Sequence, residues 1–164
     1  MKNKATEPEE VSPNARSVLK KFRLIYGTVK QHFRDVEEHC GISGSQLWLL
    51  QEIHNTPNIG VSTLASLLSI HQSTCSQLVE KLSKAKLIVK VRSAEDQRRV
   101  GLCTTESAVA LLARAPTPAE GVLPEALSAM SFEVLMQLDS ALEKVIIQLN
   151  VRNNKLEAVP LSEM

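Results

Sequence analysis

Small polar and cationic side chains share one face of a helix that the sequence predicts between Ser73 and Ala85. The apolar residues of this segment return every three or four positions, which places them on the opposite face: Cys75, Leu78, Val79, Leu82 and Ala85. Hydroxyl and amide groups can hydrogen-bond to the edges of DNA bases, and lysines can neutralise phosphates. We expect the first kind of contact from Ser73, Thr74, Ser76 and Gln77, and the second from Lys81 and Lys84. A solvated face of an ordinary amphipathic helix would have the same composition, so this segment alone leaves both interpretations open.

A shorter helix is predicted just before this one. Ser62 or Thr63 can cap its start, and its inward-facing residues are expected to be Leu64, Ala65, Leu67 and Leu68. The three residues from Ser69 to His71 then form a turn. Two short helices joined by three or four residues are typical of a helix-turn-helix, in which the second helix enters the major groove of DNA.

A two-stranded hairpin with a charged tip is predicted directly after these helices. Leu87, Val89 and Val91 alternate with Ile88, Lys90 and Arg92 in the period-two pattern of a half-buried strand, and the return strand is predicted from Arg99 to Cys103. The polar tip between them could reach a minor groove, whose negative potential attracts arginine. We expect Arg98 to enter that groove and Arg99 to contact a phosphate, while Asp96 orients Arg98 or braces the hairpin through an ion pair. The alternative is an ordinary solvated turn, and the helix-turn-helix directly upstream weighs against it.

Four segments of this region together resemble the MarR family of bacterial transcription regulators: Val61–Ala65, Ser73–Thr74, Leu78–Leu82 and Asp96–Arg99. The Asp96-x-Arg98 spacing is similar to the wing motif of that family. The resemblance implies a mainly α fold with a small β-hairpin wing, in which N- and C-terminal helices join two copies into a homodimer on double-stranded DNA. One departure is Lys86, where the family's recognition helix often ends on a glycine that can take a left-handed conformation.

The sequence predicts five consecutive parts. We expect a flexible N-terminal tail at 1–13, a dimerisation helix at 14–39, a winged helix-turn-helix domain with its connecting helix at 40–115, a linker and C-terminal dimerisation helix at 116–150, and a C-terminal tail at 151–164. The connecting helix is predicted from Thr105 to Ala115. Prolines and a glycine interrupt the helical pattern between Ala113 and Leu123, which indicates a linker there.

Both predicted terminal helices carry apolar stripes at spacings that suit contact between helices. The stripe of the first helix is Val18, Phe22, Ile25, Val29 and Val36, and that of the last helix is Leu135, Leu138, Leu142, Val145 and Leu149. These stripes could instead pack on the chain's own DNA-binding domain. We favour a dimer, because a two-fold pair reads two half-sites and so multiplies the contact with DNA.

Charge is distributed unevenly along the chain, although the net charge is only +1. Between Glu80 and Arg99 there are seven lysines and arginines against three acidic residues, whereas between Glu120 and Leu149 there are five acidic residues and one lysine. This places positive charge where DNA is expected. No stretch of the sequence approaches the ~18 apolar residues of a membrane span, so we expect a cytoplasmic location and no membrane partner.

The MarR resemblance also implies a signal that changes the spacing of the two DNA-binding domains, such as a small aromatic acid or an oxidant. If the likeness holds, the ligand cavity would lie near His32, Trp48 and Gln51, although Trp48 is more simply a core residue.

The cysteines leave a redox-sensing regulator open as an alternative. Cys103 and Cys40 are its candidates, because Cys75 is expected to be buried and unreactive. The histidines lack paired spacing, so we expect no metal site and no cofactor. The sequence contains no catalytic motif, so we do not expect the protein to be an enzyme. A winged helix that binds proteins and no longer reads bases is a further alternative, against which the cations Lys81, Lys84, Arg98 and Arg99 speak.

Overall fold

The computed structural model describes residues 12–92, 100–149 and 154–163. In chain order its elements are α1 (Pro13–Cys40), α2 (Gly44–Asn55), α3 (Val61–Leu67), α4 (Gln72–Lys84), β1 (Ile88–Arg92), β2 (Val100–Thr104), α5 (Glu106–Leu112), α6 (Val122–Ser128), α7 (Phe132–Gln148) and two 3-10 helices, η1 (Asn154–Ala158) and η2 (Leu161–Glu163). The predicted fold class, mainly helical with one hairpin, is confirmed. Within the described residues, no helix is long and apolar enough to cross a membrane.

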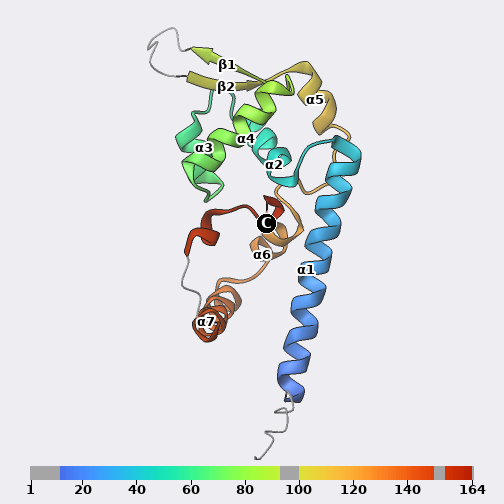
Figure 1. The fold of residues 1–164 in the computed structure, drawn as a ribbon, viewed down its shortest axis with the longest axis vertical. Coiled ribbons are helices and arrows are strands. Elements are labelled where there is room, and N and C mark those ends of the chain that lie inside the picture. Colours follow the sequence, from blue (N-terminus) through green and yellow to red (C-terminus); the bar gives the residue numbers. More distant parts are fainter. Residues whose placement is uncertain (1–11, 93–99, 150–153, 164) are drawn as a thin grey trace, which may run out of the picture.

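Helix α1 links the two ends of the molecule. Its 28 residues rise by about 42 Å, and Figure 1 shows it running from the helical head that carries the hairpin to the opposite end. Ser12 caps its start by accepting a hydrogen bond from the backbone N–H of Ala15, and Gly41 ends it with a φ of 68°. Only the second half of α1 is buried in part, at Val29, His32, Val36 and Cys40. Cys40 was expected in the following loop, but it is the last residue of the helix and is buried.

Helix α2 forms the centre of the core. A capping box fixes its start, because Ser43 accepts from the backbone N–H of Gln46 while the Gln46 side chain accepts from the backbone N–H of Ser43. Four of its apolar side chains are fully buried: Leu47, Leu49, Leu50 and Ile53. They pack with the end of α1, α3, α4, the base of the hairpin and α5 in one hydrophobic cluster. Helices α3 and α4 therefore pack on a buried support formed by α2.

Helix α3 begins earlier than predicted and buries a narrower face. Gly60 occupies its N-cap position and no side chain caps it, so the predicted cap at Ser62 or Thr63 is wrong. Leu64 and Leu68 are buried, whereas Leu67 is 53% exposed, although it was expected to face inward. Adjacent positions on a helix point in different directions, and the face that contains Leu64 and Leu68 turns Leu67 outward.

Helix α4 ends in a Schellman motif. Lys86 takes a left-handed conformation with a φ of 58°, its N–H bonds to the carbonyl of Ser83, and the N–H of Leu87 bonds to the carbonyl of Leu82. The lysine thus occupies the backbone conformation for which glycine is favoured. Ala85 was predicted on the buried face, but it is exposed because the helix ends one residue before it.

The hairpin pairs β1 with β2 in antiparallel register, with Ile88 opposite Thr104 and Lys90 opposite Leu102. The predicted alternation is not observed. Leu87 is buried as expected, but Ile88 is buried as well, and every later residue of β1 is exposed, including Val89 at 47% and Val91 at 42%. Only the base of this two-stranded sheet reaches the core, so its outer residues have no apolar surface to pack on.

The base of the hairpin is fixed by the loop after α2. The N–H of Asn58 donates to the carbonyl of Leu102, and the N–H of Leu102 donates to the carbonyl of Ile59. A Cβ at Gly101 would lie 2.8 Å from the backbone of Asn58, so this close approach requires glycine.

The connection after the hairpin differs from the prediction. Helix α5 has seven residues and ends at Leu112, so the expected long helix from Thr105 to Ala115 is wrong. A further helix that was not predicted, α6, follows the loop after α5. Helix α7 contains no buried residue. Leu135, Leu138 and Leu142 of its predicted stripe are half-buried, and Leu149 is exposed. The last segment, with η1 and η2, returns to α2 (Figure 1).

Candidate DNA-binding surface and ligand cavity

The outward face of α4 carries the polar residues that the sequence predicted. Cys75, Leu78, Val79 and Leu82 anchor the other face and are 2% exposed or less. On the opposite face, five of the predicted DNA-contacting residues are exposed: Ser73, Ser76, Gln77, Lys81 and Lys84. The sixth, Thr74, is half-buried. The structure therefore brings all six onto one helix, although it does not test whether they contact DNA.

Hydrogen bonds within the helix limit what some of these groups can offer. The hydroxyl of Ser76 donates to the carbonyl of Gln72 over 2.8 Å, so towards a ligand it can only accept. No side chain caps the start of α4, where His71 is the N-cap residue. The N–H groups of its first turn are therefore open to a phosphate oxygen.

Ion pairs divide the cations around α4 into two kinds. Lys90 of β1 pairs with Glu80 over 3.3 Å, and Lys81 pairs with Glu163 over 3.5 Å. Among the described residues, Lys84 and Arg92 form no ion pair and are exposed. These two, like the exposed Lys86 just after α4, could meet a phosphate without first releasing an acid.

The predicted tip of the hairpin, with Asp96, Arg98 and Arg99, lies outside the described residues. β1 ends at Arg92 and β2 begins at Val100. Insertion of Arg98 into a minor groove, phosphate contact by Arg99 and the support from Asp96 stay predictions.

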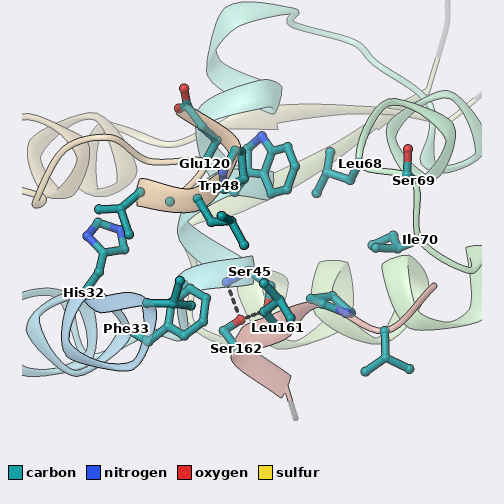
Figure 2. Close-up of a pocket in the computed structure, with 18 of the residues that line it drawn as sticks. His32, Phe33, Ser45, Trp48, Leu68, Ser69, Ile70, Glu120, Leu161 and Ser162 are labelled. Atoms are coloured by element: carbon teal, nitrogen blue, oxygen red, sulfur yellow. Dashed lines mark hydrogen bonds between the residues drawn. The ribbon is translucent and has the colours of Figure 1, made fainter. Parts of the chain in front are cut away.

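A cavity of about 450 Å³ lies between α1, α2, α6 and the C-terminal segment. Of the three residues predicted for a ligand site, His32 and Trp48 line it, and Figure 2 shows them on its wall with Phe33. Gln51 is not part of the lining, and its side chain donates to Asn55 on the surface of α2. Trp48 is also half-buried against the core, as the simpler interpretation had it, and its Nε1 donates to Glu52 over 3.1 Å.

His32 is the buried polar group of the cavity that a ligand could use. It is 7% exposed, and its ring centre lies 6.2 Å from that of Phe33. Within the described part of the chain, its ring nitrogens make no hydrogen bond to protein. The rest of the wall is mostly apolar, with Val29, Leu68, Ile70 and Leu127 among its residues. A compact apolar molecule with one polar or anionic group fits such a lining.

The C-terminal segment closes one side of the cavity, which the sequence did not predict. Leu161 and Ser162 belong to the lining, and the hydroxyl of Ser162 accepts from the backbone N–H of Ser45 over 2.9 Å, as Figure 2 shows. One oxygen of Glu163 accepts from the hydroxyls of Ser43 and Ser45 over 2.8 and 2.9 Å. These partners are more than a hundred residues apart, so no local pattern could reveal them.

The three cysteines lie in different environments. Cys75 is fully buried, and burial raises the pKa of its thiol to about 11. Burial also raises the pKa of Cys40, an effect that the charge of Arg114 opposes only in part. Cys103 is partly exposed, and its thiol donates to the side-chain oxygen of Asn58. Among the described residues, no group of histidines, cysteines and acids could hold a metal ion.

Known proteins are similar to this chain in sequence and in fold. A family model described as the MarR family matches residues 41–99. A transcriptional regulatory protein for the hcr operon of Thauera aromatica is 32% identical over 96 residues, which is 57% of this chain and 58% of that protein. The match thus spans less than two thirds of that relative.

Solved structures repeat the fold over most of the chain. A mutant of S. aureus MepR is 25% identical, with a TM-score of 0.54 over 80% of this chain and 97% of that one. Streptococcus pneumoniae FabT in complex with DNA is 16% identical, with a TM-score of 0.56 over 84% and 97% of the two chains. The second likeness shows the fold alone. The family model covers the helix-turn-helix and the first strand of the wing, and the surrounding helices have the fold of solved MarR-like structures, so the chain is similar to the MarR family in both sequence and fold.

Proposed function

We propose that this chain is a transcription regulator of the MarR family, a ligand-responsive repressor that binds an inverted-repeat operator as a homodimer in the cytoplasm. The observation that carries the proposal is the division of α4 into a fully buried face and an exposed face of hydroxyls, an amide and lysines. A helix with this division can lie in a major groove without disturbing the core beneath it.

The outward residues of α4 would divide the work of recognition. Ser73, Thr74, Ser76 and Gln77 would face base edges or nearby phosphates, while Lys81, Lys84 and Arg99 would hold the backbone. Arg98 would enter the minor groove, with Asp96 as its support. FabT, which shares the fold, was solved in complex with DNA, and this supports the assignment of α4 and the wing to DNA.

Exposed apolar residues on the terminal helices support the homodimer. Leu24 of α1 is 71% exposed, and Phe132 and Ile147 of α7 are 73% and 64% exposed. Large apolar side chains that stay exposed on two helices indicate surfaces that another protein covers. A second copy of the same chain would cover these helices and set the distance between two copies of α4.

The cavity supports a small aromatic or other organic acid as the effector. Its carboxylate would accept a hydrogen bond from the ring of His32, and its apolar part would pack against Trp48 and Phe33. Because the wall joins α1 to α2, a bound molecule could alter the angle between the dimerising helices and the DNA-binding domain. Gln51 is not included in this site.

Selection of binding sites from a random duplex library, with the purified full chain at near-physiological salt, tests the proposal. We expect an enriched inverted repeat whose half-sites lie about one helical turn apart. Enrichment of a single half-site would contradict the dimer but would still support sequence-specific DNA binding. No enrichment would favour the alternative of a winged helix that acts through protein contacts.

A redox-responsive regulator stays a second candidate because Cys103 is partly exposed on β2. Cys40 is weaker than the sequence suggested, since it is buried and the pKa of its thiol is raised. Treatment of the protein with peroxide before the selection would separate the two candidates. Only a redox sensor would lose its DNA binding in a way that a thiol reductant restores.

A further inference from the structure

The C-terminal segment contacts the DNA-binding helix at two points. The backbone N–H of His71, the N-cap residue of α4, donates to the carbonyl of Ala158 over 3.3 Å. Nearly three turns further along the helix, the Nζ of Lys81 lies 3.5 Å from Oε2 of Glu163. An acidic side chain from the end of the sequence therefore lies against a cation that is proposed to hold DNA.

Polar contacts hold this acid in place from more than one side. Glu163 accepts from the hydroxyls of Ser43 and Ser45 through one oxygen and faces Lys81 with the other. Its side chain is 25% exposed, whereas that of Lys81 is 56% exposed. Burial raises the pKa of Glu163, but the two serine hydroxyls and the charge of Lys81 outweigh this effect, so the pKa lies below its ordinary value. The carboxylate is ionised at neutral pH.

The same segment forms part of the cavity wall. Glu157, Val159, Pro160, Leu161 and Ser162 all line the cavity. A molecule in the cavity would therefore contact the segment on one side, while Glu163 contacts Lys81 next to it. The segment that would contact a molecule in the cavity is therefore the same segment that carries the ion-pair partner of Lys81.

We infer that residues 154–163 form an autoinhibitory strap, which neutralises Lys81 while it is docked and must release Lys81 before that lysine can bind a DNA phosphate. This inference rests on the proposed function, because it assumes that α4 binds DNA. DNA and the docked strap compete for Lys81, whereas a ligand that packs on Leu161 favours the docked strap. By linkage, such a ligand lowers the affinity for DNA to the same degree that DNA lowers the affinity for the ligand.

Glu163→Gln in the full chain tests the inference, with Glu157→Gln as its matched control. Both changes remove one negative charge from the strap, but only Glu163 pairs with Lys81. A glutamine at 163 still offers an oxygen to the two serines. We expect Glu163→Gln to tighten binding to a duplex about three- to five-fold more than Glu157→Gln does, and to steepen the dependence on salt by about one phosphate contact. In a Lys81→Gln background this difference should vanish.

A second measurement follows the strap without DNA. Trp48 is the single tryptophan of the chain and lines the cavity that the strap closes. Glu163→Ala removes both the charge and the acceptors of the serines, so it should shift the Trp48 emission to the red and increase its quenching by acrylamide. Glu38→Ala, at an exposed position of α1 outside the cavity lining, should not.

The outcomes separate the inference from the function on which it rests. If the wild type binds DNA and Glu163→Gln equals Glu157→Gln in affinity and salt dependence, the strap does not inhibit and the inference alone is overturned. If neither the wild type nor any variant binds DNA, the proposed function fails and the inference falls with it. An unchanged Trp48 emission in Glu163→Ala would show that Glu163 does not hold the strap, and would also overturn the inference.

Discussion

The hydroxyl of Thr105 donates to the carbonyl oxygen of Lys86 over 2.9 Å, although 19 residues separate them. The hydroxyl oxygen of Thr105 also accepts from the backbone N–H of Ala108 and so caps α5. The N–H of Thr105 bonds to the carbonyl of Leu87. One residue therefore ties together the end of α4, the start of the wing and the start of α5.

Loss of this hydroxyl should destabilise the DNA-binding domain. Thr105→Ala removes a helix cap and leaves the carbonyl of Lys86 without this donor, so we expect the free energy of unfolding to fall by about 1–2 kcal/mol. Thr105→Ser keeps the hydroxyl and should lose at most about 0.5 kcal/mol. Urea unfolding followed by circular dichroism measures both changes. Equal losses in the two variants would contradict the capping role.

The left-handed residue that ends α4 is a place where the chain can be stabilised. Lys86 has a φ of 58°, a conformation that glycine adopts without the penalty of a Cβ. Lys86→Gly should raise the free energy of unfolding by about 1 kcal/mol relative to Lys86→Ala. Both variants remove the charge, so their difference reports the backbone alone. If the Lys86→Ala protein were as stable as the Lys86→Gly protein, the left-handed backbone at Lys86 would carry no strain.

Thiol reactivity should single out Cys103. Burial raises the pKa of Cys75 to about 11, which leaves about 0.1% of it as thiolate at pH 8. Cys40 is also buried with a raised pKa. An aromatic disulfide reagent at pH 8 should therefore react quickly with one thiol per native chain, and the other two should react only on unfolding.

Cys103→Ser identifies the reactive thiol in that experiment, because it should abolish the fast reaction. A fast phase that survives in this variant would show that Cys40 or Cys75 opens to solvent in the native protein.

The dimer should depend on the exposed residues of α7. Ile147 is 64% exposed, and a glutamate there would place a charge in an apolar interface at large cost. Sedimentation equilibrium should give twice the chain mass for the wild type and a shift towards the monomer mass for Ile147→Glu. Leu67 of α3 is 53% exposed away from the terminal helices, so Leu67→Glu is the matched control and should stay dimeric. A monomeric wild type would contradict the dimer.

Periodic signals made helix α4 predictable. The buried positions Cys75, Leu78 and Leu82 of α4 follow directly from helical spacing, because a helix on a core must bury one face. The hairpin could be predicted, but not that only the base of its first strand is buried. Alternation shows which residues share a face, and only the tertiary structure shows that Ile88 is buried whereas Val89 and Val91 are exposed.

Contacts between distant segments could not be predicted in this way. The bond of Ser45 to Ser162 and the pair of Lys81 with Glu163 join residues from opposite parts of the chain. Single serines and acids near a terminus carry no pattern that distinguishes a docked strap from a solvated tail. His32 and Trp48 were expected near a ligand cavity through the MarR resemblance, and only the structure could exclude Gln51 from its lining.

Fluorescence anisotropy with two labelled duplexes, both titrated at several salt concentrations, tests whether α4 reads bases. One duplex carries the selected site and the other a scrambled version. We expect the wild type to prefer the selected duplex by at least ~10³-fold and Gln77→Ala to reduce that preference by about ten-fold. Lys84→Ala should weaken both duplexes alike and lower the salt slope by about one. Equal affinity of the wild type for the two duplexes, or an equal loss on both in Gln77→Ala, would contradict base readout by α4.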